Sequence, residues 1–118
     1  MQGMIKDLKS QTGIDKVKNA AWEYLKDAIE NKEDDDAFNQ TAYSVKLTDT
    51  HNLVVWCDVD YDFSPNGERC FITSIRDNKY DDLFGNDIGI ELITQTDTKE
   101  DLFKSIEDVI KLLADRLE

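Results

Sequence analysis

Apolar side chains recur at three- and four-residue steps near the start of the chain, which is the spacing of an amphipathic helix. This stripe predicts a helix over residues 14–31, with Trp22 at its edge. Its members are Ile14, Val17, Ala21, Leu25, Ala28 and Ile29. Upstream, Met4, Ile5 and Leu8 predict one or two further helical turns, which Gly13 interrupts.

A second stripe with the same period predicts a helix that runs to the end of the chain. Thr98 can act as its N-cap, with Asp101 three residues later as a carboxylate variant of the capping box. The apolar face consists of Leu102, Phe103, Ile106, Val109, Ile110, Leu113 and Leu117.

Between these helices the apolar positions change to a period of two, which is typical of half-buried strands. We expect strands over residues 41–47, 53–63 and 68–76, and a short fourth strand over 88–92. Turn-prone residues 49–52 and Ser64-Pro65-Asn66-Gly67 separate the first three, which therefore form an antiparallel meander. The place of the fourth strand in the sheet is left open. The elements predict one α+β domain over residues 1–118, with two layers and both helices on one face of the sheet.

Negative charge is concentrated in the middle of the chain. The net charge is −12, and residues 33–98 carry fifteen acidic side chains against four basic ones. Such a field repels nucleic acid and anionic membranes and favours a basic protein partner. No apolar run approaches the roughly 18 residues of a membrane span, and the first ten residues lack the apolar core of a signal peptide. We therefore expect a cytoplasmic protein that binds neither membrane nor nucleic acid directly.

One acidic group is the run from Glu33 to Asp36. We expect a loop there, because like charges repel and Asp is a poor helix former. A second group is Asp58, Asp60 and Asp62, which a strand would place on one face about 6.7 Å apart. That face is either a solvated surface with one ion pair, Asp62 opposite Arg69, or a strip that docks a basic surface.

Aromatic residues accompany the acidic groups. Trp56 shares the face of Asp58 and is either packed under a second apolar layer or exposed as a binding anchor. Between residues 80 and 87, aromatic and acidic residues alternate on a connection that either binds a partner or caps the core. The candidate partner-binding residues are Asp34, Asp35, Asp36, Trp56, Asp58, Asp60, Asp62, Tyr80, Asp81, Asp82 and Phe84.

The sequence contains no organised catalytic or metal-binding motif. The segment from Asp58 to Asp62 begins like a calcium loop, but Phe63 stands where that loop needs Gly and Arg69 where it needs Glu. The single histidine, His51, lies in a predicted turn, and no nucleotide-binding or hydrolase motif is present. We expect no cofactor, no metal and no enzymatic activity.

Cys57 and Cys70 fall in separate predicted strands. We interpret them as two reduced, buried thiols; a disulfide or part of a metal site are the alternatives.

These features predict a small acidic, non-enzymatic protein that binds and inhibits a basic, nucleic-acid-handling protein by mimicking nucleic acid. In composition and element order the chain resembles bacterial toxin-immunity proteins and phage-type inhibitors of defence nucleases, without a matched motif. The alternatives are an adaptor domain or an acidic secretion chaperone, although those chaperones carry a dimerisation helix between strands three and four where this chain has a polar stretch. The sequence does not decide between monomer and homodimer.

Overall fold

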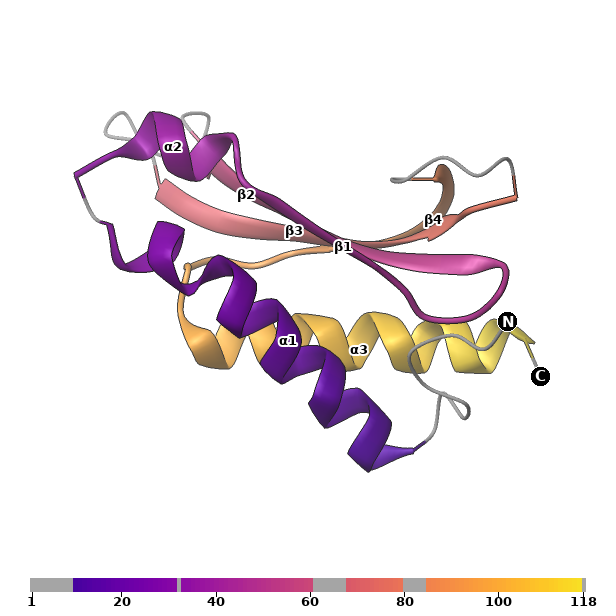
Figure 1. Ribbon diagram of the computed structural model, residues 1–118. Helices are drawn as coiled ribbons and strands as arrows, with labels where there is room; N and C mark the ends of the chain where they lie inside the picture. Colours follow the sequence, from indigo (N-terminus) through magenta and orange to yellow (C-terminus); the bar gives the residue numbers. More distant parts are fainter. Residues whose placement is uncertain (1–9, 32, 61–67, 80–84, 118) are drawn as a thin grey trace.

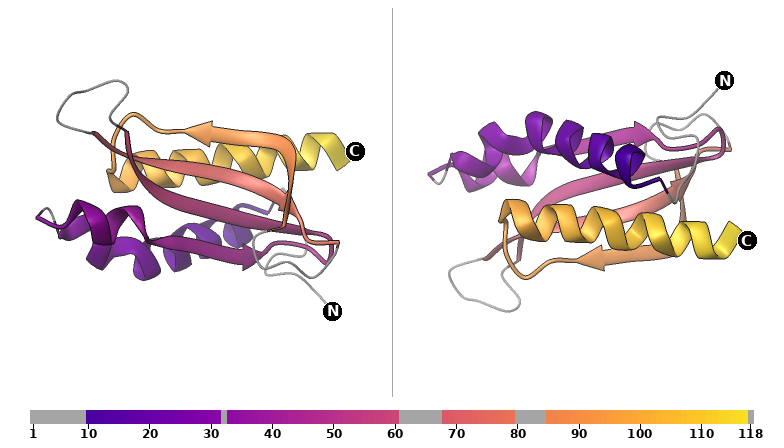
Figure 2. Two further views of the ribbon diagram at one scale, coloured as in Figure 1. Left: turned by 90° about the horizontal axis from the view of Figure 1, so that it is seen from above. Right: turned by 90° about the horizontal axis from the view of Figure 1, so that it is seen from below.

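Helices and strands form two layers in the computed structural model, which describes residues 10–31, 33–60, 68–79 and 85–117. A four-stranded sheet is one layer, and helices α1 (Gln11–Glu30) and α3 (Lys99–Leu117) are the other. Figure 1 and Figure 2 show both helices crossing the same face of the sheet. The predicted α+β architecture is therefore confirmed.

The sheet is an antiparallel meander in the order β1-β2-β3-β4. Its strands are β1 (Ala42–Lys46), β2 (His51–Asp60), β3 (Glu68–Asp77) and β4 (Asn86–Ile93). Thus β4 is an edge strand beside β3. His51 was expected in the turn but is the first residue of β2. Its carbonyl oxygen accepts the N–H of Leu47 at 2.9 Å, so the strand pairing begins before the end of the predicted turn at residue 52. The predicted end of the second strand and the turn at 64–67 lie outside the described residues.

Helix α1 begins earlier than the apolar stripe indicated, because Ser10 caps it. The Oγ atom of Ser10 accepts the backbone N–H of Gly13 at 3.3 Å. Gly13 therefore lies in the first turn of the helix, and the prediction that it interrupts the helix is wrong. The residues Met4, Ile5 and Leu8 fall outside the described part of the chain.

Helix α3 follows its sequence pattern closely. The Oγ1 atom of Thr98 accepts the N–H of Asp101 at 3.2 Å, as the predicted cap requires. The apolar stripe is buried except at its edges, where Phe103 is half-buried and Leu117 is 54% exposed. None of the helices in the described ranges has the length and apolarity needed to cross a membrane.

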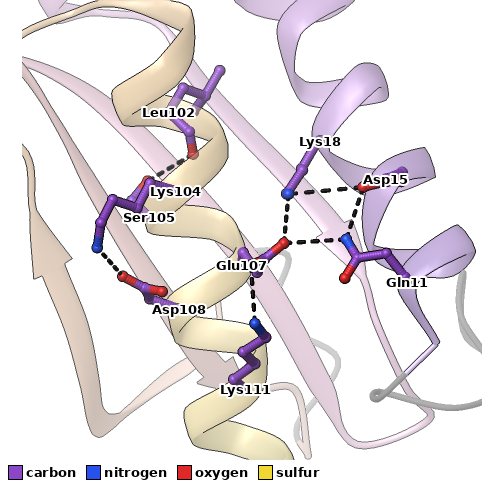
Figure 3. A network of polar contacts seen from close by, with 9 residues as sticks. All are labelled: Gln11, Asp15, Lys18, Leu102, Lys104, Ser105, Glu107, Asp108 and Lys111. Carbon is purple, nitrogen blue, oxygen red and sulfur yellow. Dashed lines mark hydrogen bonds and ion pairs between the residues drawn. The ribbon is translucent and has the colours of Figure 1, made fainter.

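The core lies between the sheet and the helices. The core residues of β2 are Leu53, Val55, Cys57 and Val59. The alternation along this strand predicts a core face of Val55, Cys57, Val59 and Tyr61, of which Tyr61 lies outside the described residues. The two helices are also joined by charge, since Lys18 Nζ donates to Glu107 Oε1 at 2.7 Å (Figure 3). One polar pair is enclosed in the core, Thr73 Oγ1 and Ser105 Oγ at 2.9 Å.

Candidate functional site

The acidic run that was expected to be a loop starts a short helix, α2 (Asp35–Asn39). Asp34 is its N-cap, and its Oδ1 atom accepts the N–H of Ala37 at 2.9 Å. Asp35 and Asp36 occupy the first turn, where the helix dipole stabilises negative charge. The loop prediction is therefore wrong, because these charges sit where a helix N-terminus favours them. All three carboxylates are exposed.

Arg69, at the start of β3, holds this short helix against the rest of the molecule. Its side chain is only 10% exposed, and its Nε donates to Asp35 Oδ1 at 2.9 Å. The other guanidinium nitrogens donate to the carbonyl oxygens of Ala28, Ile29 and Asn31, at 3.3, 3.4 and 2.7 Å. These carbonyls belong to the end of α1, where backbone acceptors have no helical partner. One guanidinium thus joins α1, α2 and β3.

The predicted ion pair between Asp62 and Arg69 is contradicted by the register. Arg69 lies opposite Val59, and its strand position directs it toward the helices. The expectation assumed a tight four-residue turn directly after Phe63. Asp62 itself lies outside the described residues.

The alternation of β2 places Asp58 on the face of the sheet away from the two long helices, with Trp56 on the same face. Asp58 is half-buried, and it lies opposite Cys70 of β3. The exposed Glu68 of β3 lies opposite Asp60, and the alternation of β3 puts the Glu68 carboxylate on the same face as Asp58. The side chain of Asp60 is not among those described.

We call Asp34, Asp35, Asp36, Asp58 and Glu68 the acidic end. They come from α2 and its N-cap, from the end of β2 and from the start of β3, and Figure 1 shows α2 beside this end of the two strands. A hydrogen bond from Val59 N–H to Asn39 Oδ1, 3.3 Å long, holds α2 beside β2. The acidic run is therefore brought to the same end of the molecule as Asp58 and Glu68.

Trp56 belongs to a row of apolar residues that crosses all four strands. It lies opposite Ala42 of β1 and Ile72 of β3, and Ile72 in turn lies opposite Ile93 of β4. Trp56 is half-buried, and the guanidinium carbon of Arg76 lies 5.5 Å from the centre of its ring. In the described part of the chain the indole is thus packed against a cation, not under a second apolar layer, and part of it reaches solvent on the face of Asp58. Its role as a binding anchor stays a prediction.

The third group of candidates belongs to the connection between β3 and β4. Tyr80, Asp81, Asp82 and Phe84 lie outside the described residues. The residues that flank them, Lys79 and Gly85, lie at the other end of the sheet, where Asp77 is opposite His51. Ten-residue strands separate the two ends by roughly 30 Å.

The remaining chemical groups are structural. Cys57 and Cys70 are both buried and form no disulfide, and the prediction of two reduced, buried thiols is confirmed. They point to opposite faces of the sheet, and burial raises the pKa of Cys57 to about 12. His51 is half-buried in β2, and burial lowers its pKa. Among the described residues, no cluster of His, Cys, Asp and Glu has the arrangement of a metal site.

Sequence reasoning missed two features. Arg69 was assigned to a surface ion pair, although its buried role follows from a register that the sequence did not fix. The second missed feature is a pair of exposed apolar residues, Ile93 on β4 and Leu112 on α3, which are 60% and 47% exposed. Ile93 lies one residue beyond the predicted fourth strand, and Leu112 lies outside the apolar stripe of its helix. Apolar residues that fall just outside a predicted buried pattern are the signal that could have found them.

Comparison with protein-family models, with curated proteins and with solved structures finds no match for this chain.

Proposed function

We propose that this chain is a non-enzymatic binding protein that occupies a basic, nucleic-acid-handling site on another protein and thereby inhibits it. The observation that carries the proposal is the acidic end, where carboxylates from α2, β2 and β3 lie at one end of the sheet and Asp58 shares a face with the half-buried Trp56. Binding surfaces commonly combine an aromatic anchor with a charged rim.

The acidic end supports electrostatic steering. Arg69 is buried and is already used by Asp35 and three carbonyl groups. Within the described ranges, no ion pair neutralises Asp36, Asp58 or Glu68. A concentrated negative field speeds the encounter with a basic partner and loses strength as salt screens it.

Trp56 supports retention of the partner after encounter. Its row of apolar neighbours gives the partner a strip of contact area across the sheet, ending at the exposed Ile93. Burial of such residues slows dissociation more than it changes association.

An affinity capture from lysate of the source cells tests the proposal. The bait is the wild-type protein, and the test variant is Asp58→Lys with Glu68→Lys. The matched control is Asp49→Lys with Asp115→Lys, which makes the same change in charge at exposed positions toward the other end of the sheet.

The proposal expects one basic nucleic-acid-handling protein to be captured by wild type and control, lost with the test variant, and lost when salt rises from about 50 to about 500 mM. Addition of the bait to the purified partner should then inhibit its nucleic-acid activity. A captured partner that is acidic, or that the test variant binds as well as wild type, would contradict the proposal.

The secretion-chaperone alternative has no specific observation in its favour. It calls for a dimerisation helix between strands three and four. The described residues between β3 and β4, which are 78, 79 and 85, form no helix.

A further inference from the structure

The outer edge of β4 carries backbone groups that point away from the sheet. Thr94 N–H donates to the carbonyl oxygen of Phe71 at 3.0 Å, which marks their pair as hydrogen-bonded. Hydrogen-bonded and non-hydrogen-bonded pairs alternate along an antiparallel ladder, so Ile90 and Leu92 also bond to β3. The N–H and C=O groups of Glu91 and Ile93 therefore point outward, to the free edge of the sheet. No described residue forms a hydrogen bond with these groups.

The first half of the same edge is closed. The ladder shifts register between Ile75 and Arg76 of β3, opposite the part of β4 where Gly89 adopts a φ of 81°. Arg116 of α3 donates to the carbonyl oxygen of Ile88 at 2.6 Å. Register shifts and covering side chains are ways in which proteins protect sheet edges from pairing. The open stretch is thus confined to the last residues of β4.

A groove runs beside this open stretch, between β4 and α3. It has a volume of about 420 Å³. Its lining is Leu92, Ile93, Thr94, Gln95, Asp101, Lys104, Ser105 and Asp108. Figure 3 shows Lys104 and Asp108 on the side of α3 that faces β4, whereas Glu107 faces α1. Leu112, four residues after Asp108, continues this flank by the helical period.

We propose that this edge and groove bind an extended, basic segment of the partner, which adds to the sheet as a fifth, antiparallel strand. The inference rests on the proposed function for the existence of a basic partner, and it specifies how that partner is held. Addition of a strand to an open edge is an established mode of peptide recognition. The charge of the site selects a basic strand, since Asp101 and Asp108 line the groove with one cation, Lys104, that is already paired with Asp108 at 2.8 Å. Glu91 adds a negative charge on the other face of β4.

A second copy of this chain does not fit the same edge. Antiparallel pairing of two β4 strands would place both Glu91 side chains on the same face of the joined sheet, in opposed or neighbouring positions, and would bring together two chains that each carry a net charge of −12. Like charges so close on one face destabilise a sheet.

The register also assigns the side chains of the added strand. Residues that exchange hydrogen bonds with Glu91 and Ile93 would share the face of those residues, beside the exposed Ile93. The alternate residues would point to the other face, toward Asp101 and Asp108 in the groove. The site therefore suits an alternating strand whose apolar side chains meet Ile93 and whose basic side chains enter the groove.

A short synthetic peptide of about eight residues, alternating valine and arginine and blocked at both ends, is the probe. Two analogues carry backbone N-methyl groups, one on the valines and one on the arginines, because a methylated amide cannot donate. Titrations followed through the backbone amide resonances of the full chain give the affinities.

We expect the parent peptide to shift the resonances of Glu91 and Ile93. Methylation of the valines, whose N–H groups face β4, should lower the affinity of the peptide at least about tenfold, which corresponds to about 1.4 kcal/mol. Methylation of the arginines, whose N–H groups point away from β4, should change the affinity less than threefold. Equal affinity of the two analogues, or shifts that leave β4 unchanged, would overturn the proposal.

Substitutions in the protein separate this inference from the proposed function. Glu91→Pro removes the outward N–H without touching the ladder to β3, a position where proline is tolerated. Its matched control, Glu91→Thr, loses the same charge and keeps the N–H. Proline alone should abolish binding of the parent peptide. The lysate capture depends on the acidic end and uses Asp58→Lys with Glu68→Lys. If the wild-type protein captures a basic partner but does not bind the peptide through β4, strand addition is refuted and the proposed function stands.

Discussion

The guanidinium of Arg69 lies over the ring of Phe38, with its carbon atom 4.5 Å from the ring centre. Phe38 is fully buried and contacts Phe71 of the core, with their ring centres 6.3 Å apart. This stacking, together with the hydrogen bonds to Asp35 and to the end of α1, fixes α2 against the sheet. The acidic end therefore depends on one buried cation for its shape.

Substitution of Arg69 should test that dependence. Arg69→Met keeps an apolar stem but leaves the carbonyls of α1 without a donor, and we expect it to lower the free energy of unfolding by about 2 kcal/mol. Arg69→Lys is the matched control, and it should recover only part of the loss because an ammonium cannot reproduce the planar fork. Urea unfolding of the three proteins gives the comparison. A lysine variant as stable as wild type would show that charge alone matters.

The hydroxyl pair between β3 and α3 makes a directional prediction. Ser105 Oγ donates to the carbonyl oxygen of Leu102 at 2.9 Å, so the hydrogen between the two hydroxyls comes from Thr73. Ser105→Ala leaves the buried Thr73 donor unsatisfied and should cost about 1–3 kcal/mol of stability. Thr73→Val leaves Ser105 bonded and should cost less, and the double variant should be no worse than Ser105→Ala. The opposite order in chemical denaturation would reverse the assignment of the donor.

The two thiols should be inert in the folded protein. The pKa of Cys57 is raised to about 12 by burial, so at pH 8 about one thiol in ten thousand is ionised, and Cys70 is only 4% exposed. Ellman's reagent should therefore label both cysteines quickly in denaturant and neither within minutes in native buffer. Rapid labelling of native Cys57 would contradict the packed core.

The Glu107 network makes stability depend on pH. Hydrogen bonds from Lys18, Lys111 and Gln11 hold the pKa of this carboxyl at about 2, below its ordinary value of 4.5 (Figure 3). A lowered pKa in the folded state stabilises the protein above pH 4.5, and this contribution is lost as the pH falls toward 2.

Glu107→Gln should therefore lower the free energy of unfolding at pH 7 by about 1 kcal/mol, a small value because solvent screens the partly exposed pairs. The difference from wild type should shrink between pH 4.5 and pH 3 in urea titrations. Glu23→Gln, which removes an exposed pair on α1 alone, is the control with a smaller effect. A difference that stays constant down to pH 3 would exclude the linkage.

The two long helices and the meander of the first three strands could be predicted because local patterns specify them. The α3 stripe and the cap at Thr98 were visible as periodic apolar positions and a known cap signature. The errors arose where a distant residue decides the local structure. The run at Asp34 reads as a loop until Phe38 is seen to enter the core and Arg69 to bind Asp35.

The candidate site was only partly predictable for the same reason. Alternation placed Trp56 and Asp58 on one face correctly, because strand geometry is local. Pairing is not local, and the register puts Arg69 opposite Val59 on the core side, not opposite Asp62 on the surface. The open edge at Glu91 and Ile93 follows from the position of β4 in the sheet, which the sequence left undecided.

The association rate of this chain with its captured partner, measured across ionic strengths, tests the central claim most directly. If the acidic end steers a basic partner, the wild-type rate constant should fall about tenfold or more between about 50 and about 500 mM salt. The Asp58→Lys, Glu68→Lys variant should associate slowly even at low salt, while the Asp49→Lys, Asp115→Lys control should remain close to wild type. A rate that does not change with salt, or two variants that slow equally, would contradict the account.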